Sequence, residues 1–119
     1  MRYLNGFICA LLTLFAMLQY NDPDAFLWIV IYGVPAVWAG LAAWRPGGLA
    51  HSPAALCALG LCLILALAGT IYMWPADFSV WWDVEEVRED VGLMIVTAAL
   101  LVVALTLWRS RRVPVEGRA

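Results

Sequence analysis

The sequence predicts an all-α membrane protein in which four transmembrane helices form an up-down antiparallel bundle. Three observations support this fold class: the composition, the spacing of four apolar runs, and the separation of basic from acidic residues. Of the 119 residues, 65% are hydrophobic and only 13% are charged. A soluble domain of this length keeps too much of its surface in water to hide so much apolar area. The composition is therefore typical of membrane proteins.

Four apolar runs each approach the roughly 20 residues that a helix needs to cross a bilayer. We expect spans at about residues 3–20, 25–44, 53–74 and 84–108, of which the last begins with a charged segment. The connections between them are short, which favours antiparallel neighbours. The whole chain is therefore expected to form a single transmembrane domain that ends in a basic cytoplasmic tail at 109–119.

Polar residues stand where three of these helices are expected to begin. Asp22 and Ser52 each precede a proline, which is the arrangement of an N-cap followed by proline at the first helical position. Asp83 is followed three residues later by Glu86, as in a capping box. We therefore expect Asp22, Ser52 and Asp83 to cap the second, third and fourth helices.

The charged residues are divided between the two sides of such a bundle. Six of the seven basic residues, all of them Arg, fall at the N-terminus, in the middle connection and in the tail. These places share one side of a four-span chain, and the positive-inside rule puts that side in the cytoplasm. Eight of the nine acidic residues fall on the other side. We therefore expect a multi-pass protein of the plasma membrane, or of a bacterial inner membrane, with cytoplasmic termini and acidic loops outside.

The tryptophans agree with this orientation. Because an indole is apolar but its N–H needs a partner, Trp favours the boundary between lipid and water. Six of the seven tryptophans are expected to form an aromatic belt. Those at the outer boundary are Trp28, Trp74, Trp81 and Trp82, and those at the inner boundary are Trp44 and Trp108.

The apolar parts of the four runs contain no Asp, Glu, Lys, Arg or His. Transporters and pumps usually need an ionisable group near the bilayer midplane. On the outer side no Ser or Cys can pair with a His as nucleophile and base. The sequence therefore favours neither transport nor catalysis. The polar groups at depth are expected to be only hydroxyls and thiols: Thr13, Thr70, Thr97 and Thr106, with Cys9, Cys57 and Cys62.

Polarity gathers instead on the expected outer side. The segment QYNDPD (residues 19–24) follows the first span, and five charged residues lie on the first turns of the fourth: Glu85, Glu86, Arg88, Glu89 and Asp90. Glu85, Glu89 and Gly92 share one helix face there. If that face packs against residues 19–24, seven polar residues lie close together at the outer end of the bundle: Gln19, Asn21, Asp22, Asp24, Glu85, Arg88 and Glu89.

Oxygen ligands of this kind suit Ca²⁺, Mg²⁺ or a cationic organic group rather than zinc. The candidate metal ligands are Asp22, Asp24, Glu85 and Glu89. An alternative needs no ligand. In it, Arg88 is the internal counter-ion of the carboxylates, and the acids are solvated residues of the kind that helix N-termini favour.

The two polar segments resemble the transmembrane protein 220 family. QYNDPD followed by Trp28 and Tyr32, and the pattern E-x-x-R-E-x-x-G-L at 85–93, carry the resemblance, which extends over essentially the whole chain. It implies the same four-helix membrane fold. It implies no particular reaction, because no activity is established for the family. The matching positions are Gln19, Tyr20, Asn21, Asp22, Pro23, Asp24, Glu85, Arg88, Glu89 and Gly92.

We interpret the chain as a small multi-pass membrane protein that binds a divalent cation, Ca²⁺ or Mg²⁺, or a cationic headgroup at an acidic outward-facing pocket. The alternative is a non-catalytic accessory subunit of a larger membrane complex, held together by an Arg–carboxylate network. A third hypothesis is a metal-dependent enzyme that acts on lipid. The expected partners are the lipid bilayer and a membrane protein or a second copy of the chain, with no nucleic acid.

Overall fold

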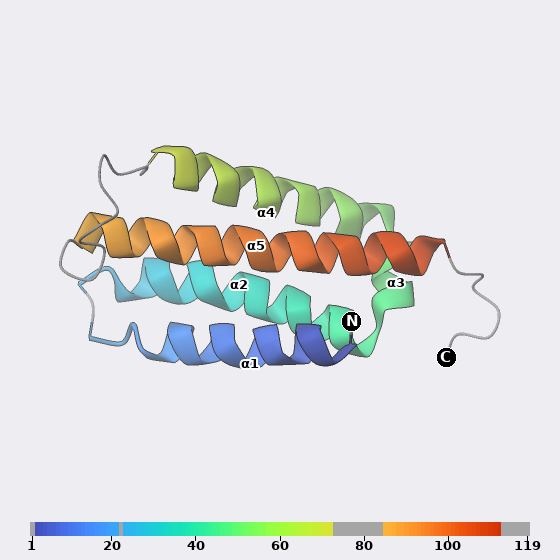
Figure 1. Ribbon diagram of the computed structural model, residues 1–119, viewed down its shortest axis with the longest axis horizontal. Coiled ribbons are helices and arrows are strands. Elements are labelled where there is room, and N and C mark those ends of the chain that lie inside the picture. Colours follow the sequence, from blue (N-terminus) through green and yellow to red (C-terminus); the bar gives the residue numbers. More distant parts are fainter. Residues whose placement is uncertain (1, 22, 73–84, 113–119) are drawn as a thin grey trace.

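The computed structural model describes residues 2–21, 23–72 and 85–112, and in the last range it describes the side chains from Glu89 onward. Within these residues the chain is helical and contains no strand. Figure 1 shows four long helices that alternate in direction and one short helix in the middle connection. They are α1 (Arg2–Met17), α2 (Ala25–Trp44), α3 (Pro46–Ala50), α4 (Pro53–Tyr72) and α5 (Glu85–Arg111).

The array of helices has two chemically different ends. One end, where α1 begins and where α2 and α5 finish, carries Arg2, Arg45 and Arg109 (Figure 1), and we call it the arginine-rich end. The other end, where α2 and α5 begin, carries Asp24 and Glu89, and we call it the acidic end. The charge separation in the sequence is therefore a separation in space along the helices.

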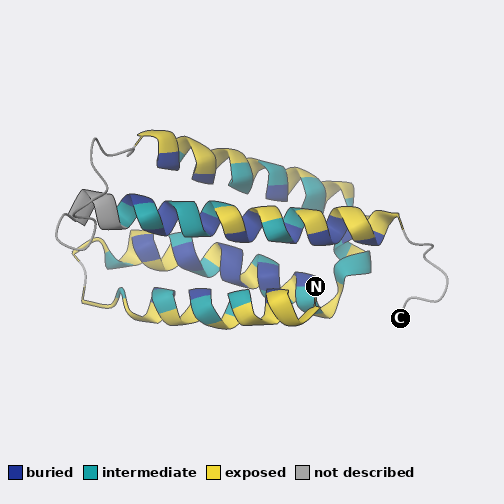
Figure 2. Cartoon of the chain, viewed as in Figure 1, coloured by how far each residue is buried: buried dark blue, intermediate teal, exposed yellow. Residues whose placement is uncertain are grey.

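α5 is the central helix of the array. It lies between α2 and α4 (Figure 1) and also contacts α3. Leu100, Val103 and Leu107 are 1%, 0% and 1% exposed. Side chains spaced three or four residues apart share one face of a helix. The core therefore runs lengthwise along α5, as the buried band in Figure 2 shows.

α4 packs along one side only, chiefly against α5 and the short α3. Gly69 permits a close approach, because a Cβ there would come within 3.3 Å of Leu93 Cδ1. Large apolar side chains elsewhere on α4, among them Leu61, Ile64 and Leu65, are exposed. Lipid tails are as apolar as these side chains, so such a face is stable in a bilayer without further protein packing.

Among the described residues, three helices are long and apolar enough to cross a membrane: Ala25–Trp44, Pro53–Tyr72 and Glu89–Arg111. α1 is also apolar but has 16 residues. At 1.5 Å per residue its length is about 24 Å, against a hydrocarbon core of roughly 30 Å. These helices define an all-helical membrane protein.

A side chain caps the start of α4, whereas the residue before α2 makes no capping hydrogen bond. The amide of Ala55 donates a hydrogen bond to Ser52 Oγ at 3.2 Å, at the beginning of α4. The residue that precedes α2 is Asp24, whose side chain makes no capping hydrogen bond. Asp22 and Asp83, the other residues expected to cap helices, lie outside the described residues.

Trp28, which was expected in the aromatic belt, is buried against other side chains rather than exposed to lipid or water. It is 5% exposed, and its ring centroid lies 5.9 Å from that of Tyr32 on the same helix. It is therefore a core residue of the acidic end. Trp44 and Trp108, in contrast, are 74% and 55% exposed at the arginine-rich end. The remaining members of the expected belt, Trp74, Trp81 and Trp82, lie outside the described residues.

Candidate functional site at the acidic end

The two segments that carry the family resemblance meet where Tyr32 of α2 contacts Gly92 of α5. A Cβ on Gly92 would overlap the Tyr32 hydroxyl and would lie 3.2 Å from Tyr32 Cζ. Glycine is required here because only a residue without a side chain lets the phenol approach the backbone of α5 so closely. This contact fixes the rotation of α5 relative to α2 at the acidic end.

An aromatic cluster holds Tyr32 in this position. The ring of Phe15 in α1 meets the ring of Tyr32 edge-on, with a centroid distance of 5.5 Å and an interplanar angle of 72°. Trp28 packs on Tyr32 from one turn earlier in α2. Edge-to-face geometry is the preferred arrangement of aromatic pairs. Side chains from α1 and α2 therefore place the Tyr32 hydroxyl on α5.

Glu89 lies on the same face of α5 as Gly92, one turn nearer the helix start. It is partly buried, and its carboxylate acts electrostatically on Tyr32. Of the predicted site residues whose side chains are described, Glu89 and Gln19 are partly buried, whereas Asn21 and Asp24 are exposed. The position of Glu89 follows from the Tyr32–Gly92 contact, which turns this face of α5 toward α2.

Asp90, the next residue, is enclosed on another face of α5. It is 0% exposed, and neither carboxylate oxygen has a hydrogen-bond partner among the described residues. Asp90 shares its helix face with Leu93, which contacts Gly69 of α4. A buried carboxylate without a partner is costly, because it loses its hydration and gains nothing in return.

The other predicted site residues divide into two groups. Gln19 uses its side chain locally, since Nε2 donates a hydrogen bond to the carbonyl oxygen of Phe15 at 3.2 Å. Asn21 and Asp24 are exposed. The side chains of Asp22, Glu85 and Arg88 lie outside what the structure describes. Within the described residues, no three His, Cys, Asp or Glu side chains gather closely enough to hold a metal ion.

The predicted site leaves out Asp90 and Asn5, two of the polar residues that the structure buries. Asp90 follows Glu89 directly, and its spacing from Leu93 is the signal that places it on the face of α5 toward α4. Asn5 corrects the expectation that only hydroxyls and thiols lie at depth. It is 0% exposed in α1, and its Nδ2 donates a hydrogen bond to Thr106 Oγ1 at 2.8 Å.

The fold and this site together define a small helical membrane protein in which Tyr32 of α2 contacts Gly92 of α5 at the acidic end of the array. Residues 11–105 match the family described as "Transmembrane family 220, helix". The chain is also 34% identical, over 110 residues, to transmembrane protein 220 of Xenopus laevis, and the alignment covers 84% of this chain and 56% of that relative. The chain therefore belongs to the transmembrane 220 family, and the resemblance drawn from its motifs is confirmed.

The chain spans little more than half the length of this curated relative. No solved structure matches it.

Proposed function

We propose that the chain crosses the membrane four times, with its acidic end outside, and binds a cation at that end. α1 supports the fourth crossing because it is apolar and packs antiparallel to α2, with which it makes its main contacts. Four crossings bring both termini to the arginine-rich end. The positive-inside rule assigns this end to the cytoplasm.

The observation that carries the cation proposal is the burial of Asp90. A carboxyl group that is 0% exposed and has no hydrogen-bond partner among the described residues is stabilised either by protonation or by a compensating positive charge. A bound cation supplies that charge and coordinates the oxygens directly. Glu89 precedes Asp90 in the sequence and is also partly buried, on the face of α5 that turns toward α2.

The remaining ligands follow from the sequence, which puts Asp22, Asp24 and Glu85 at the same end. A set of carboxylate oxygens favours Ca²⁺ or Mg²⁺ over metals that prefer nitrogen or sulfur ligands. The ammonium group of a lipid headgroup carries the same sign of charge and fits the same carboxylates. The proposed ligand is therefore a divalent cation, with a cationic headgroup as the competing occupant.

Equilibrium binding of radioactive Ca²⁺ to the purified full chain in mild detergent tests this proposal. The wild-type protein is expected to bind Ca²⁺ saturably, and Mg²⁺ or ethanolamine in competition identifies the preferred cation. Asp90→Asn should weaken binding by roughly 10–100-fold or more, since losing even an outer-shell partner of a metal site has an effect of that size.

The matched control is Glu116→Gln, which removes the same charge from the C-terminal tail and should leave binding unchanged. Absence of saturable binding by the wild-type protein, or equal binding by Asp90→Asn, would show that the acidic end is not a cation site.

A further inference from the structure

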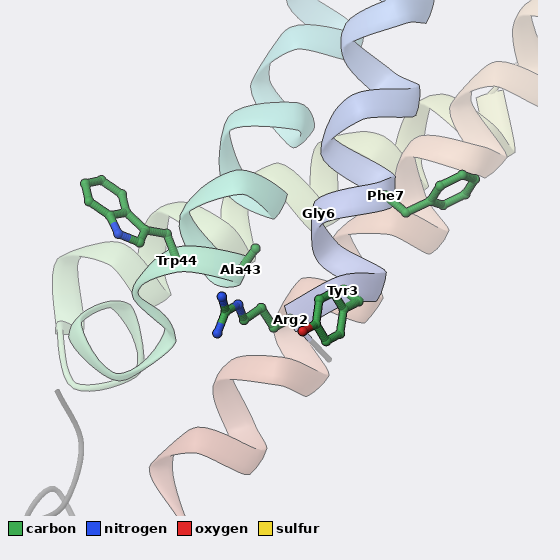
Figure 3. Close-up of a pocket in the computed structure, with 6 residues that line it drawn as sticks. All are labelled: Arg2, Tyr3, Gly6, Phe7, Ala43 and Trp44. Atoms are coloured by element: carbon green, nitrogen blue, oxygen red, sulfur yellow. The ribbon is translucent and has the colours of Figure 1, made fainter.

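A groove opens between the beginning of α1 and the end of α2, at the arginine-rich end. Its volume is about 660 Å³, and it is lined by Arg2, Tyr3, Gly6, Phe7, Ala43 and Trp44 (Figure 3). The aromatic side chains at its edge are largely exposed, with Tyr3 at 86% and Trp44 at 74%. The groove therefore combines one guanidinium group with wide apolar walls.

The charge at this groove is positive, and no acidic side chain of the described residues lies near it. Figure 3 shows the Arg2 side chain reaching from α1 toward the end of α2, below Ala43. The guanidinium of Arg45, the next residue after α2, lies 5.2 Å from the centroid of the Trp44 ring. The acidic side chains that the structure describes, Asp24, Glu89 and Asp90, all belong to the opposite end of the array.

A second groove lies along the seam between α1 and α2. The two share Trp44 as a lining residue, and the second has a volume of about 390 Å³. Its walls are mainly small or apolar residues: Cys9, Thr13, Ala16, Gly33, Ala36 and Gly40 are among them. A Cβ placed on Gly33 would meet no atom within 4 Å. This glycine therefore leaves open space along the seam instead of packing against another helix.

We propose that these two grooves together bind one anionic phospholipid, such as phosphatidylglycerol. The phosphate lies against Arg2, because a guanidinium binds phosphate oxygens through charge-assisted hydrogen bonds. Tyr3 and Trp44 flank the headgroup at the boundary between lipid and water, where aromatic side chains are favoured. One acyl chain follows the α1–α2 seam past Gly40 and Gly33.

The combination of the two grooves favours a phospholipid over other anions. A free phosphate ion uses only Arg2 and leaves the apolar seam without an occupant. A phospholipid uses both, because it carries an anionic phosphate and an apolar acyl chain in one molecule. The site lies at the end opposite Asp90, so its existence does not depend on the proposed cation site.

Binding to the purified full chain in mild detergent tests the proposal, with lipid retention followed by native mass spectrometry during titration. Dioleoylphosphatidylglycerol is expected to bind saturably and more tightly than dioleoylphosphatidylcholine. Arg2→Gln should raise the dissociation constant for phosphatidylglycerol about fivefold, the effect expected for one basic residue near an anionic lipid surface. Gly33→Leu, which fills the seam, should weaken binding of phosphatidylglycerol while Arg2 is intact.

Two variants serve as controls for these changes. Arg112→Gln removes a guanidinium that lies over Trp108 at the same end but does not line the groove. Gly60→Leu adds the same side chain to α4, at a glycine that also has open space around it. Both should bind phosphatidylglycerol as the wild-type protein does.

Three results would overturn the proposal. The first is equal retention of the two lipids with no effect of Arg2→Gln, which removes the headgroup contact. The second is binding of phosphatidylglycerol by Gly33→Leu at wild-type affinity, which removes the acyl-chain seam. The third is saturation by inorganic phosphate alone with displacement of the lipid, which makes the site one for free anions.

Discussion

At the scale of single residues, Gly92 and Tyr32 fix the geometry of the acidic end. The Tyr32 hydroxyl occupies the space that a Cβ on Gly92 would need. Phe15 and Trp28 hold the Tyr32 ring from two sides. Because the contact turns Glu89 toward α2, a small change at position 92 is expected to disturb the polar residues one turn away.

Gly92→Ala should lower the free energy of unfolding by about 1–3 kcal/mol, the usual cost of overpacking. Unfolding with increasing sodium dodecyl sulfate in mild detergent, followed by circular dichroism, measures this change. Tyr32→Phe in the same chain should restore part of the loss, because it removes the overlapping hydroxyl. Gly33→Ala is the control, since its Cβ would meet nothing within 4 Å. Equal stability of the Gly92→Ala and Gly33→Ala variants would contradict the account.

The sequence identified Tyr32 and Gly92 as motif residues but could not show that they touch. Their contact depends on how α2 and α5 are rotated about their axes. Neither helix has a strongly one-sided apolar pattern, because lipid accepts apolar side chains on every face. The burial of Asp90 could not be predicted for the same reason. The sequence places Asp90 on a face of α5, but it does not show which helix covers that face.

At the scale of helices, one polar contact joins α1 to the central helix. Asn5 Nδ2 donates a hydrogen bond to Thr106 Oγ1, and Thr106 in turn donates one to the carbonyl oxygen of Val102 at 2.8 Å. α1 makes far fewer contacts with α5 than with α2. The Asn5 side chain therefore attaches α1 to α5 through a specific hydrogen bond at the arginine-rich end.

Asn5→Ala should destabilise the protein by about 0.6–1.7 kcal/mol, the range measured for hydrogen bonds between membrane helices. Thr13→Ala is the matched control. Thr13 Oγ1 donates a hydrogen bond to the carbonyl oxygen of Cys9 in its own helix at 2.7 Å and is exposed, so its loss should cost less than about 0.5 kcal/mol. The same unfolding assay compares the two, and equal losses would mean that Asn5 does not attach α1 to α5.

The apolar runs, and the turn and capping residues between them, indicated where the long helices lie. The sequence did not predict which helices are neighbours in space. An up-down bundle predicts that consecutive helices are neighbours, yet α5 lies between α2 and α4. Close contacts through single glycines, such as Gly69 against Leu93, select these neighbours. Many small residues in the sequence satisfy the same pattern, so the sequence could not single out these pairs.

At the scale of the whole molecule, the array has opposite charge at its two ends. Four crossings with the acidic end outside require Tyr3 and Asn21, at the two ends of α1, to lie on opposite sides of the membrane. Both residues are exposed. Their accessibility therefore reports on the number of crossings and on the orientation at once.

Single cysteines at these positions, in a chain from which Cys9, Cys57 and Cys62 have been replaced, test this arrangement. A membrane-impermeant thiol reagent added to intact spheroplasts should label Asn21→Cys. It should label Tyr3→Cys, and the control His51→Cys in the middle connection, only after the membrane is opened. Labelling of Tyr3→Cys and Asn21→Cys from the same side would show that α1 does not cross.

The charge separation also connects the two proposed sites, which lie at opposite ends and bind ligands of opposite sign. The central claim concerns the acidic end, where we propose that a cation compensates the burial of Asp90, which has no hydrogen-bond partner among the described residues. The most direct measurement is the thermal midpoint of the wild-type protein and of Asp90→Asn in mild detergent, each with chelator and with saturating Ca²⁺.

In chelator, Asp90→Asn should be more stable than the wild-type protein, because a neutral amide costs less to bury than a carboxylate without a partner. Saturating Ca²⁺ should raise the midpoint of the wild-type protein, since a ligand at 100 times its dissociation constant contributes about 2.7 kcal/mol. The midpoint of Asp90→Asn should stay unchanged by Ca²⁺. The claim is contradicted if Ca²⁺ shifts both midpoints equally, or shifts neither.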